Sequence, residues 1–353
     1  MTDQDSAIRY LVQQAYAQEP CPELDVAAGL SDVLNRVRRP ARQLSVADSY
    51  PNSRQGLATL KLELPAPFNQ DLSLILCLLS GNTLGEQEEL ANDPVTASYL
   101  AAGMRLIERN LGPGGARTPV DLEGDIPVQR PLLSFLSERA VVAEVANNAY
   151  PFSRAGNVAT LRSIWRSQSD FIADLLRFGL WAAHYPAAHQ HEVTAAAEQA
   201  IIGVDFVAAI HTICYWDLLV YLGMPMFRLQ LVAAASSEDD EAIQRAISER
   251  YSETIGLWKE LYASFLDVRG LRLREGITLD ECADLLTAVA EGLALRQLAD
   301  PNAKFFDHER RSSLLGKATL AVIKGCLESA EASDGLTLEQ AVHDMIHDHR
   351  RAT

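Results

Sequence analysis

Apolar residues recur three and four positions apart along most of this 353-residue chain, which is the spacing of one face of an α-helix. This pattern predicts helices at residues 7–18, 97–110, 192–222, 224–235, 239–268, 278–299, 311–330 and 336–349. The apolar runs Leu72–Leu79 and Phe171–Leu176 predict two further helices. No alternating run of convincing length predicts a strand. We therefore expect a nearly all-α fold.

A short motif occurs twice in the first half of the chain. Residues 50–56 read Tyr-Pro-Asn-Ser-Arg-Gln-Gly, and residues 150–156 read Tyr-Pro-Phe-Ser-Arg-Ala-Gly. In both copies Val-Ala precedes the motif and Ala-Thr-Leu with a basic residue follows it. The copies therefore indicate one small duplicated unit.

Each copy predicts two helices joined by a turn at the Tyr-Pro pair. A proline disfavours helical geometry in the residue before it. Ser53 or Ser153 is then a suitable N-cap for the following helix. The predicted pairs are 38–48 with 54–62 and 135–148 with 154–165.

The formal net charge of −16 is unevenly distributed along the chain. Residues 33–62 hold six basic residues and one acidic residue, a net of +5. Residues 139–167 hold four and one, a net of +3, whereas residues 181–353 hold 15 and 26, a net of −11. A charge run is most often a solvated helix face. The coincidence of both basic islands with the repeat favours binding of a polyanion.

Duplex DNA is the polyanion that these residue types suit. The second helix of a helix-turn-helix enters the major groove, where basic and small polar side chains contact bases and phosphates. The first copy and its flank offer Arg39, Arg42, Ser53, Arg54, Gln55, Thr59 and Lys61. The second copy offers Ser153, Arg154, Asn157, Thr160 and Arg162. Periodicity alone favours a helical hairpin that only packs, because such hairpins are far more common than DNA-binding ones.

Residues 153–176, SRAGNVATLRSIWRSQSDFIADLL, resemble the recognition helix and the next helix of TetR-family transcription regulators. Residues 250–270 and 288–294 resemble the ligand-binding and dimerisation domain of that family. The resemblance implies a homodimeric, ligand-responsive repressor that binds double-stranded DNA. The chain departs from the family in having two copies that resemble its DNA-binding unit, and we call each copy a head. The first copy has Pro65 and Pro67 where the second has Trp165.

The expected architecture is two tandem helix-turn-helix units followed by a helical-bundle domain. The first, diverged unit covers residues 1–92, the second covers 93–180, and residues 181–353 form the ligand-binding and dimerisation domain. Aromatic side chains with a polar group suit an effector pocket in that domain. The candidates are His211, Tyr215, Trp216, Trp258 and Tyr262. A structural role for His211, as a hydrogen-bonded histidine of the core, is at least as good an interpretation.

Other site classes are disfavoured by what the sequence lacks. His184, His189 and His191 cluster, but alanines and Pro186 beside them suggest an exposed loop, so we expect no metal and no cofactor. No P-loop, nucleophile elbow or zinc-protease motif occurs, so we expect no enzyme. Two alternative functions remain compatible with the sequence. One is an all-α ligand- or protein-binding module whose heads no longer bind DNA, and the other is an all-α enzyme built on a repurposed pocket.

The expected location is the cytoplasm. The five cysteines form no CxxC pair, which favours reduced thiols in the core. The first residues lack the pattern of a signal peptide. We expect no stretch to approach the length of apolar sequence needed to span a bilayer.

Overall fold

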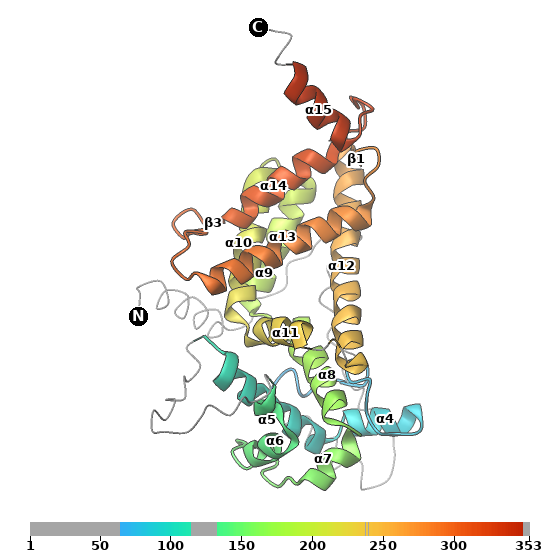
Figure 1. Cartoon of the computed structure of the whole chain (residues 1–353), viewed down its shortest axis with the longest axis vertical. Coiled ribbons are helices and arrows are strands. Elements are labelled where there is room, and N and C mark those ends of the chain that lie inside the picture. The colour runs from blue at the N-terminus through green and yellow to red at the C-terminus, as the bar shows by residue number, and fades with distance from the viewer. Residues whose placement is uncertain (1–63, 114–132, 237, 239, 349–353) are drawn as a thin grey trace. The chain divides into compact units, whose positions relative to one another are not determined.

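The computed structural model describes residues 64–113, 133–236, 238 and 240–348 (Figure 1). The chain divides into two compact units. Of the described residues, those within 64–184 and 224–251 form the central unit, and those within 185–223 and 252–348 form the C-terminal unit. The described residues are mostly helical, with only two short pairs of strands, which confirms the helical fold class.

Helices of the central unit account for most of its described residues. They are α4 (Leu84–Ala91), α5 (Pro94–Leu111), η1 (Ser134–Leu136), α6 (Glu138–Val145), α7 (Val158–Ile164), α8 (Gln168–Gly179), η2 (Ala182–His184) and α11 (Pro225–Ser236). Helix α12 (Glu241–Arg269) begins in this unit and ends in the other.

The C-terminal unit adds the remaining elements. They are α9 (Ala187–Ile202), α10 (Phe206–Gly223), β1 (Leu271–Leu273), α13 (Leu279–Ala299), β2 (Phe306–Asp307), β3 (Ser312–Ser313), α14 (Leu314–Cys326), β4 (Leu327–Ser329) and α15 (Leu338–Asp348). Strand β1 pairs antiparallel with β4, and β2 pairs antiparallel with β3.

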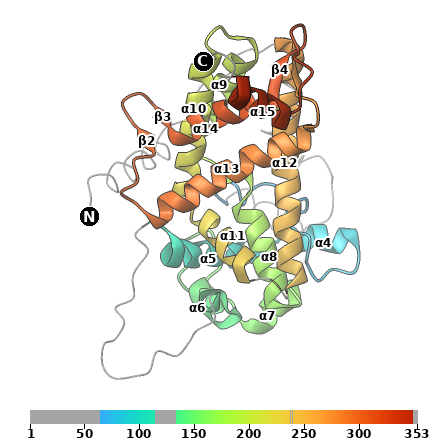
Figure 2. The ribbon, with the colours of Figure 1, turned by 45° about the horizontal axis from the view of Figure 1, so that its top comes forward.

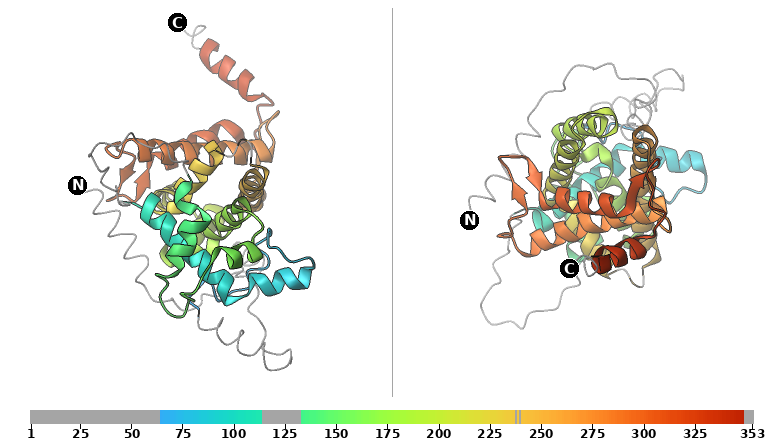
Figure 3. Two further views of the ribbon diagram at one scale, coloured as in Figure 1. Left: turned by 60° about the horizontal axis from the view of Figure 1, so that its bottom comes forward. Right: turned by 90° about the horizontal axis from the view of Figure 1, so that it is seen from above.

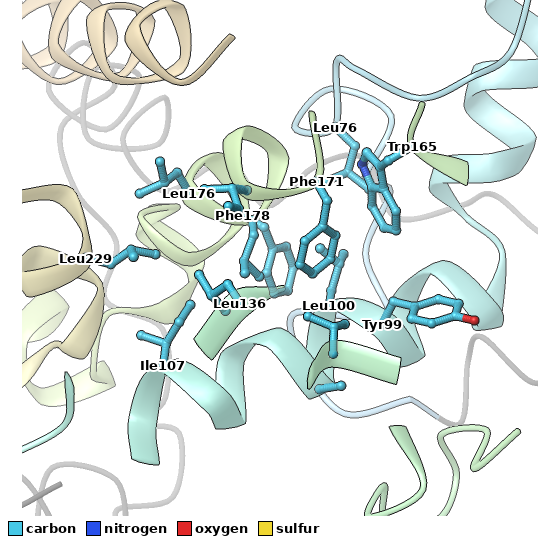
Figure 4. Packing of buried hydrophobic residues seen from close by; sticks show 14 of the residues in the cluster. Leu76, Tyr99, Leu100, Ile107, Leu136, Trp165, Phe171, Leu176, Phe178 and Leu229 are labelled. Atoms are coloured by element: carbon cyan, nitrogen blue, oxygen red, sulfur yellow. The ribbon is translucent and has the colours of Figure 1, made fainter. Parts of the chain in front are cut away.

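The core of the central unit gathers around aromatic side chains from α5, α8 and the residue that follows α7, Trp165 (Figure 4). Trp165 and Phe171 meet edge to face, with ring centroids 5.0 Å apart. Helix α8 starts with a capping box between Ser167 and Asp170, which satisfies backbone N–H groups at the helix start. Because the apolar residues of α8 recur at helical spacing, the helix buries Phe171, Leu175 and Phe178.

The helix predicted at Leu72–Leu79 is wrong, because this segment forms turns and irregular structure. Leu72, Leu76 and Leu79 are still buried in the same core. The backbone N–H groups of Cys77 and Leu78 donate to the Asp174 carboxylate, at 3.0 and 3.1 Å. This carboxylate supplies acceptors for backbone groups that a helix would have satisfied internally.

Helix α10 lies at the centre of the C-terminal unit, where it packs against α9, α13 and α14 (Figure 2). The single helix predicted at 192–222 is two helices, since residues 203–205 separate α9 from α10. The predicted helix at 311–330 is likewise shorter, because its last residues form β4.

One helix among the described residues, α10, is long and apolar enough to cross a membrane. The expectation that no stretch approaches this length is therefore wrong. Residues along α10, among them Ile213, Leu218 and Leu219, are buried within the C-terminal unit. A core helix of a soluble protein has the same length and composition.

Candidate nucleic-acid interface

Helix α7, the helix expected to face DNA, is anchored by its inner side. Leu161 and Ile164 are buried in the core, and Trp165 is buried directly after the helix ends. The Asn157 side chain caps the helix by accepting a hydrogen bond of 2.8 Å from the Thr160 N–H. The outer side of α7 exposes Ala159, Arg162 and Ser163.

The second copy of the repeated motif forms an ordered loop between α6 and α7. We call residues 146–157 the motif loop. It is longer than the three- or four-residue turn of a typical helix-turn-helix. The helix predicted from residue 154 begins later, at Val158, and its N-cap is Asn157 rather than Ser153.

The motif loop is tied to α5 at two points. The Tyr99 hydroxyl accepts a hydrogen bond from the Asn157 N–H and donates one to the Asn157 carbonyl, both at 3.0 Å. The Ser98 hydroxyl accepts one of 2.9 Å from the Ser153 N–H. A Cβ at Gly156 would come 3.0 Å from Val145 and 3.2 Å from the Tyr99 hydroxyl. The motif glycine thus allows the loop to lie close against its neighbours.

Buried Asn148 organises the interior of the motif loop. Its amide donates to the carbonyls of Ser98 and Ser153, at 3.2 and 2.6 Å. The Asn148 carbonyl in turn accepts a hydrogen bond of 2.7 Å from the Arg154 Nε. Sequence reasoning missed Asn148, although the pair Asn147-Asn148, one residue before the Tyr-Pro motif, was a visible signal.

A buried carboxylate supports the same region from α6. Glu144 is 4% exposed and accepts hydrogen bonds from Arg105 and Arg109 at 2.9–3.0 Å. Burial by itself raises the pKa of Glu144, but the hydrogen bonds from Arg109 and Arg105 outweigh it and lower the pKa. Glu144 is therefore a charged structural anchor.

The five expected DNA contacts of the second copy differ in availability. The side-chain oxygens of Ser153 and Asn157 bond to nearby backbone, and Thr160 is half-buried. Arg154 is exposed beyond its bond to the loop. Arg162 is 63% exposed but forms a two-pronged ion pair with Glu138 at 2.8–3.1 Å.

Further exposed arginines come from the same elements. Arg139 follows Glu138 on α6, and Arg166 follows the end of α7 and donates to the Ser80 carbonyl at 3.3 Å. Together with Arg154 and Arg162, they give this part of the central unit four exposed guanidinium groups. Such groups bind phosphates and guanine edges.

The contacts expected from the first copy lie outside the described residues. They are Arg39, Arg42, Ser53, Arg54, Gln55, Thr59 and Lys61. The site described by the structure is therefore the second copy.

The expected effector-pocket residues all lie in the C-terminal unit, and two pairs of them are in ring contact. Trp258 stacks on Tyr262 with ring centroids 6.0 Å apart, and Tyr215 meets Trp216 edge to face at 5.8 Å. Trp258 packs with the apolar residues of α9 and α10. Tyr262 packs beside Cys282 and Cys326, and burial raises its pKa. The Tyr215 hydroxyl lies 3.0 Å from His308 Nδ1.

Two of the expected pocket residues have buried nitrogens without hydrogen-bond partners in the described part of the chain. These atoms are His211 Nδ1 and Trp216 Nε1. Both atoms lie on α10 and have hydrogen-bonding capacity left for a ligand.

The prediction that His184, His189 and His191 lie in an exposed loop is wrong. His189 is 6% exposed on α9, and its Nε2 lies 2.9 Å from the Asp217 carboxylate. His184 packs edge to face on Phe178. Within the described ranges, no three His, Cys, Asp or Glu side chains gather as metal ligands would.

Comparison with known proteins gives no relative. No family model, curated protein or solved structure matches the chain.

Proposed function

We propose that this chain is a sequence-specific DNA-binding transcription regulator, acting as a ligand-responsive homodimeric repressor in the cytoplasm. The observation that carries the proposal is the second motif copy. There, a fixed loop and a capped helix present Arg154 and the outer face of α7, next to the exposed guanidinium groups of α6 and α7. The resemblance of residues 153–176 to TetR-family recognition helices supports the same role.

The mechanism follows from where the charges lie. Arginines of the second copy would contact phosphates and base edges, while the acidic C-terminal half, net −11, is repelled by the duplex. An effector bound among the α10 and α12 aromatic residues would shift the population of dimer states, and only one state would space the heads for successive major grooves.

The first copy extends the proposal. If both copies bind, a dimer carries four heads and protects a long or composite operator. A footprint no longer than that of two heads would limit DNA reading to one copy per chain.

A second candidate function is favoured by the Glu138–Arg162 ion pair. This pair partly neutralises the most prominent cation of α7. With the net charge of −16, it supports a ligand- or protein-binding module whose heads no longer contact DNA.

Selection of bound fragments from the source genome separates the two candidates. The DNA-binding proposal predicts enrichment of a few fragments, and loss of that enrichment in Arg154→Ala. Arg245→Ala is the matched control, because Arg245 is an exposed arginine on α12, 56% exposed and paired with Glu241. Random recovery of fragments by the wild-type protein favours the module instead.

A further inference from the structure

Helix α13 carries an apolar stripe on the side that faces away from its own unit. Leu285 and Leu295 are 46% and 51% exposed. The stripe also includes exposed Ala288, Gly292 and Ala299. The helix lies beside α14 at the surface of the C-terminal unit (Figures 2 and 3).

The stripe lies on the solvent-facing side of α13, where apolar residues are unusual. Its residues recur at alternating spacings of three and four, so they share one face. The inner side of α13 buries Cys282, Ala283, Leu286, Ala294 and Gln297. Solvent-facing sides of helices normally carry charged or polar residues, but no charged residue lies on the stripe from Leu285 to Ala299. Exposed apolar faces of this kind mark contact surfaces.

The stripe is complementary to itself. When two copies of α13 run antiparallel about a two-fold axis at Gly292, Leu285 lies opposite Ala299, and the stripe residue next to Leu295 is Ala288, one position from the point directly opposite. Each large side chain then lies beside a small one, as interlocking helices require. A Cβ at Gly292 would meet no atom within 4 Å, so the helices can approach closely at the axis.

The charges at the two ends of α13 agree with the same pairing. Exposed Asp280, Glu281 and Asp284 lie near its start, and exposed Arg296 and Lys304 outnumber exposed Asp300 near or just after its end. An antiparallel arrangement brings the acidic end of each copy to the basic end of the other. A parallel arrangement would place like charges together.

We infer that the α13 stripe is the surface on which a second copy of this chain docks, with a two-fold axis at Gly292. The inference deepens the proposed function, since it names the contact that holds the proposed dimer together. It concerns association alone, so it is tested without DNA.

The first test measures the mass of the full-length protein by sedimentation over a range of concentrations. The wild-type protein is expected to be a dimer, and the double variant Leu285→Glu/Leu295→Glu a monomer. Leu84→Glu, on α4, is the matched control, because Leu84 is 85% exposed and lies outside the stripe. It is expected to leave the mass unchanged.

The second test places one cysteine at the inferred axis. In a background with Cys21 and Cys77 changed to serine, Gly292→Cys is expected to join two copies with a short thiol-reactive cross-linker. Gly256→Cys, on α12, is the matched control, because a Cβ there also meets no atom within 4 Å. It is expected to cross-link at least tenfold less.

These two tests can overturn the inference. A wild-type protein that is monomeric at all concentrations would overturn it, and would mean that a different protein covers the stripe. A dimer that survives the double glutamate substitution, or equal cross-linking at positions 256 and 292, would place the contact elsewhere. Loss of DNA binding by an intact dimer would instead count against the proposed function only.

Discussion

The indole N–H of Trp165 donates a hydrogen bond of 3.0 Å to the Asp174 carboxylate, and both side chains are buried. The same carboxylate accepts hydrogen bonds from the backbone of Cys77 and Leu78 and pairs with Arg177 at 3.0 Å. One buried acid therefore joins the end of α7, the segment that precedes α4, and α8.

Removing that acid should strongly destabilise the central unit. Asp174→Ala leaves four donors without their acceptor, and we expect it to lower the free energy of unfolding by about 3–5 kcal/mol. Urea denaturation followed by tryptophan fluorescence measures this loss. Asp170→Ala, which removes only the N3 carboxylate of the α8 capping box, should cost about 1 kcal/mol. Equal small losses in both variants would show that Asp174 does not hold these segments together.

The attachment of the motif loop to α5 can be tested with a variant of nearly the same shape. Tyr99→Phe removes the hydroxyl that bonds both backbone groups of Asn157. We expect a stability loss of about 1–2 kcal/mol and faster hydrogen exchange in residues 153–160. Exchange unchanged in that segment would mean that the loop is fixed by other contacts.

Acid should destabilise the central unit through His184. Burial lowers the pKa of this imidazole to about 4, from an ordinary value of 6.5. Between these values the unfolded chain binds a proton that the folded chain does not. Stability is therefore fully present above pH 6.5 and is lost as the pH falls toward 4.

Allowing for the partly exposed edge of the ring, we expect His184 to contribute about 2 kcal/mol to this loss. Denaturation at pH 7 and pH 4 measures the loss, and His184→Gln should show correspondingly less of it. The same pH dependence in the wild-type protein and the variant would assign the effect to other groups.

Freeing Arg162 should strengthen DNA binding. Glu138→Gln removes the partner that neutralises Arg162, so we expect the affinity for duplex DNA to rise about tenfold at low salt. Fluorescence anisotropy with a labelled duplex measures the change. Glu89→Gln is the control, because it makes the same charge change at an exposed position of α4. A rise as large in the control would show only the effect of net charge.

Sequence periodicity predicted the long helices well, because apolar residues at helical spacing give each helix a face to bury. Helices α5, α11, α12 and α13 begin and end within a few residues of their predicted bounds. The capping residue Thr278 at the start of α13 was likewise visible in the sequence.

Long-range contacts account for the errors. The irregular path of Leu72–Leu79 depends on Asp174, about one hundred residues later, which no local pattern indicates. The delayed start of α7 depends on Tyr99 and Asn148, which hold the preceding loop in place. In the candidate site, residue types identified Arg154 and Arg162, but not the Glu138 partner on the adjacent helix.

The salt dependence of DNA affinity tests the central claim most directly. With a duplex from the genomic selection, the logarithm of the wild-type affinity should fall steeply with the logarithm of salt concentration, because arginines release counterions from phosphates. Arg154→Ala and Arg162→Ala should each weaken binding, and each should reduce the slope by about 1 if its guanidinium contacts a phosphate. Arg245→Ala should change neither value. Affinity that is absent or independent of salt, or a loss equal in Arg245→Ala, would contradict DNA binding through the second motif copy.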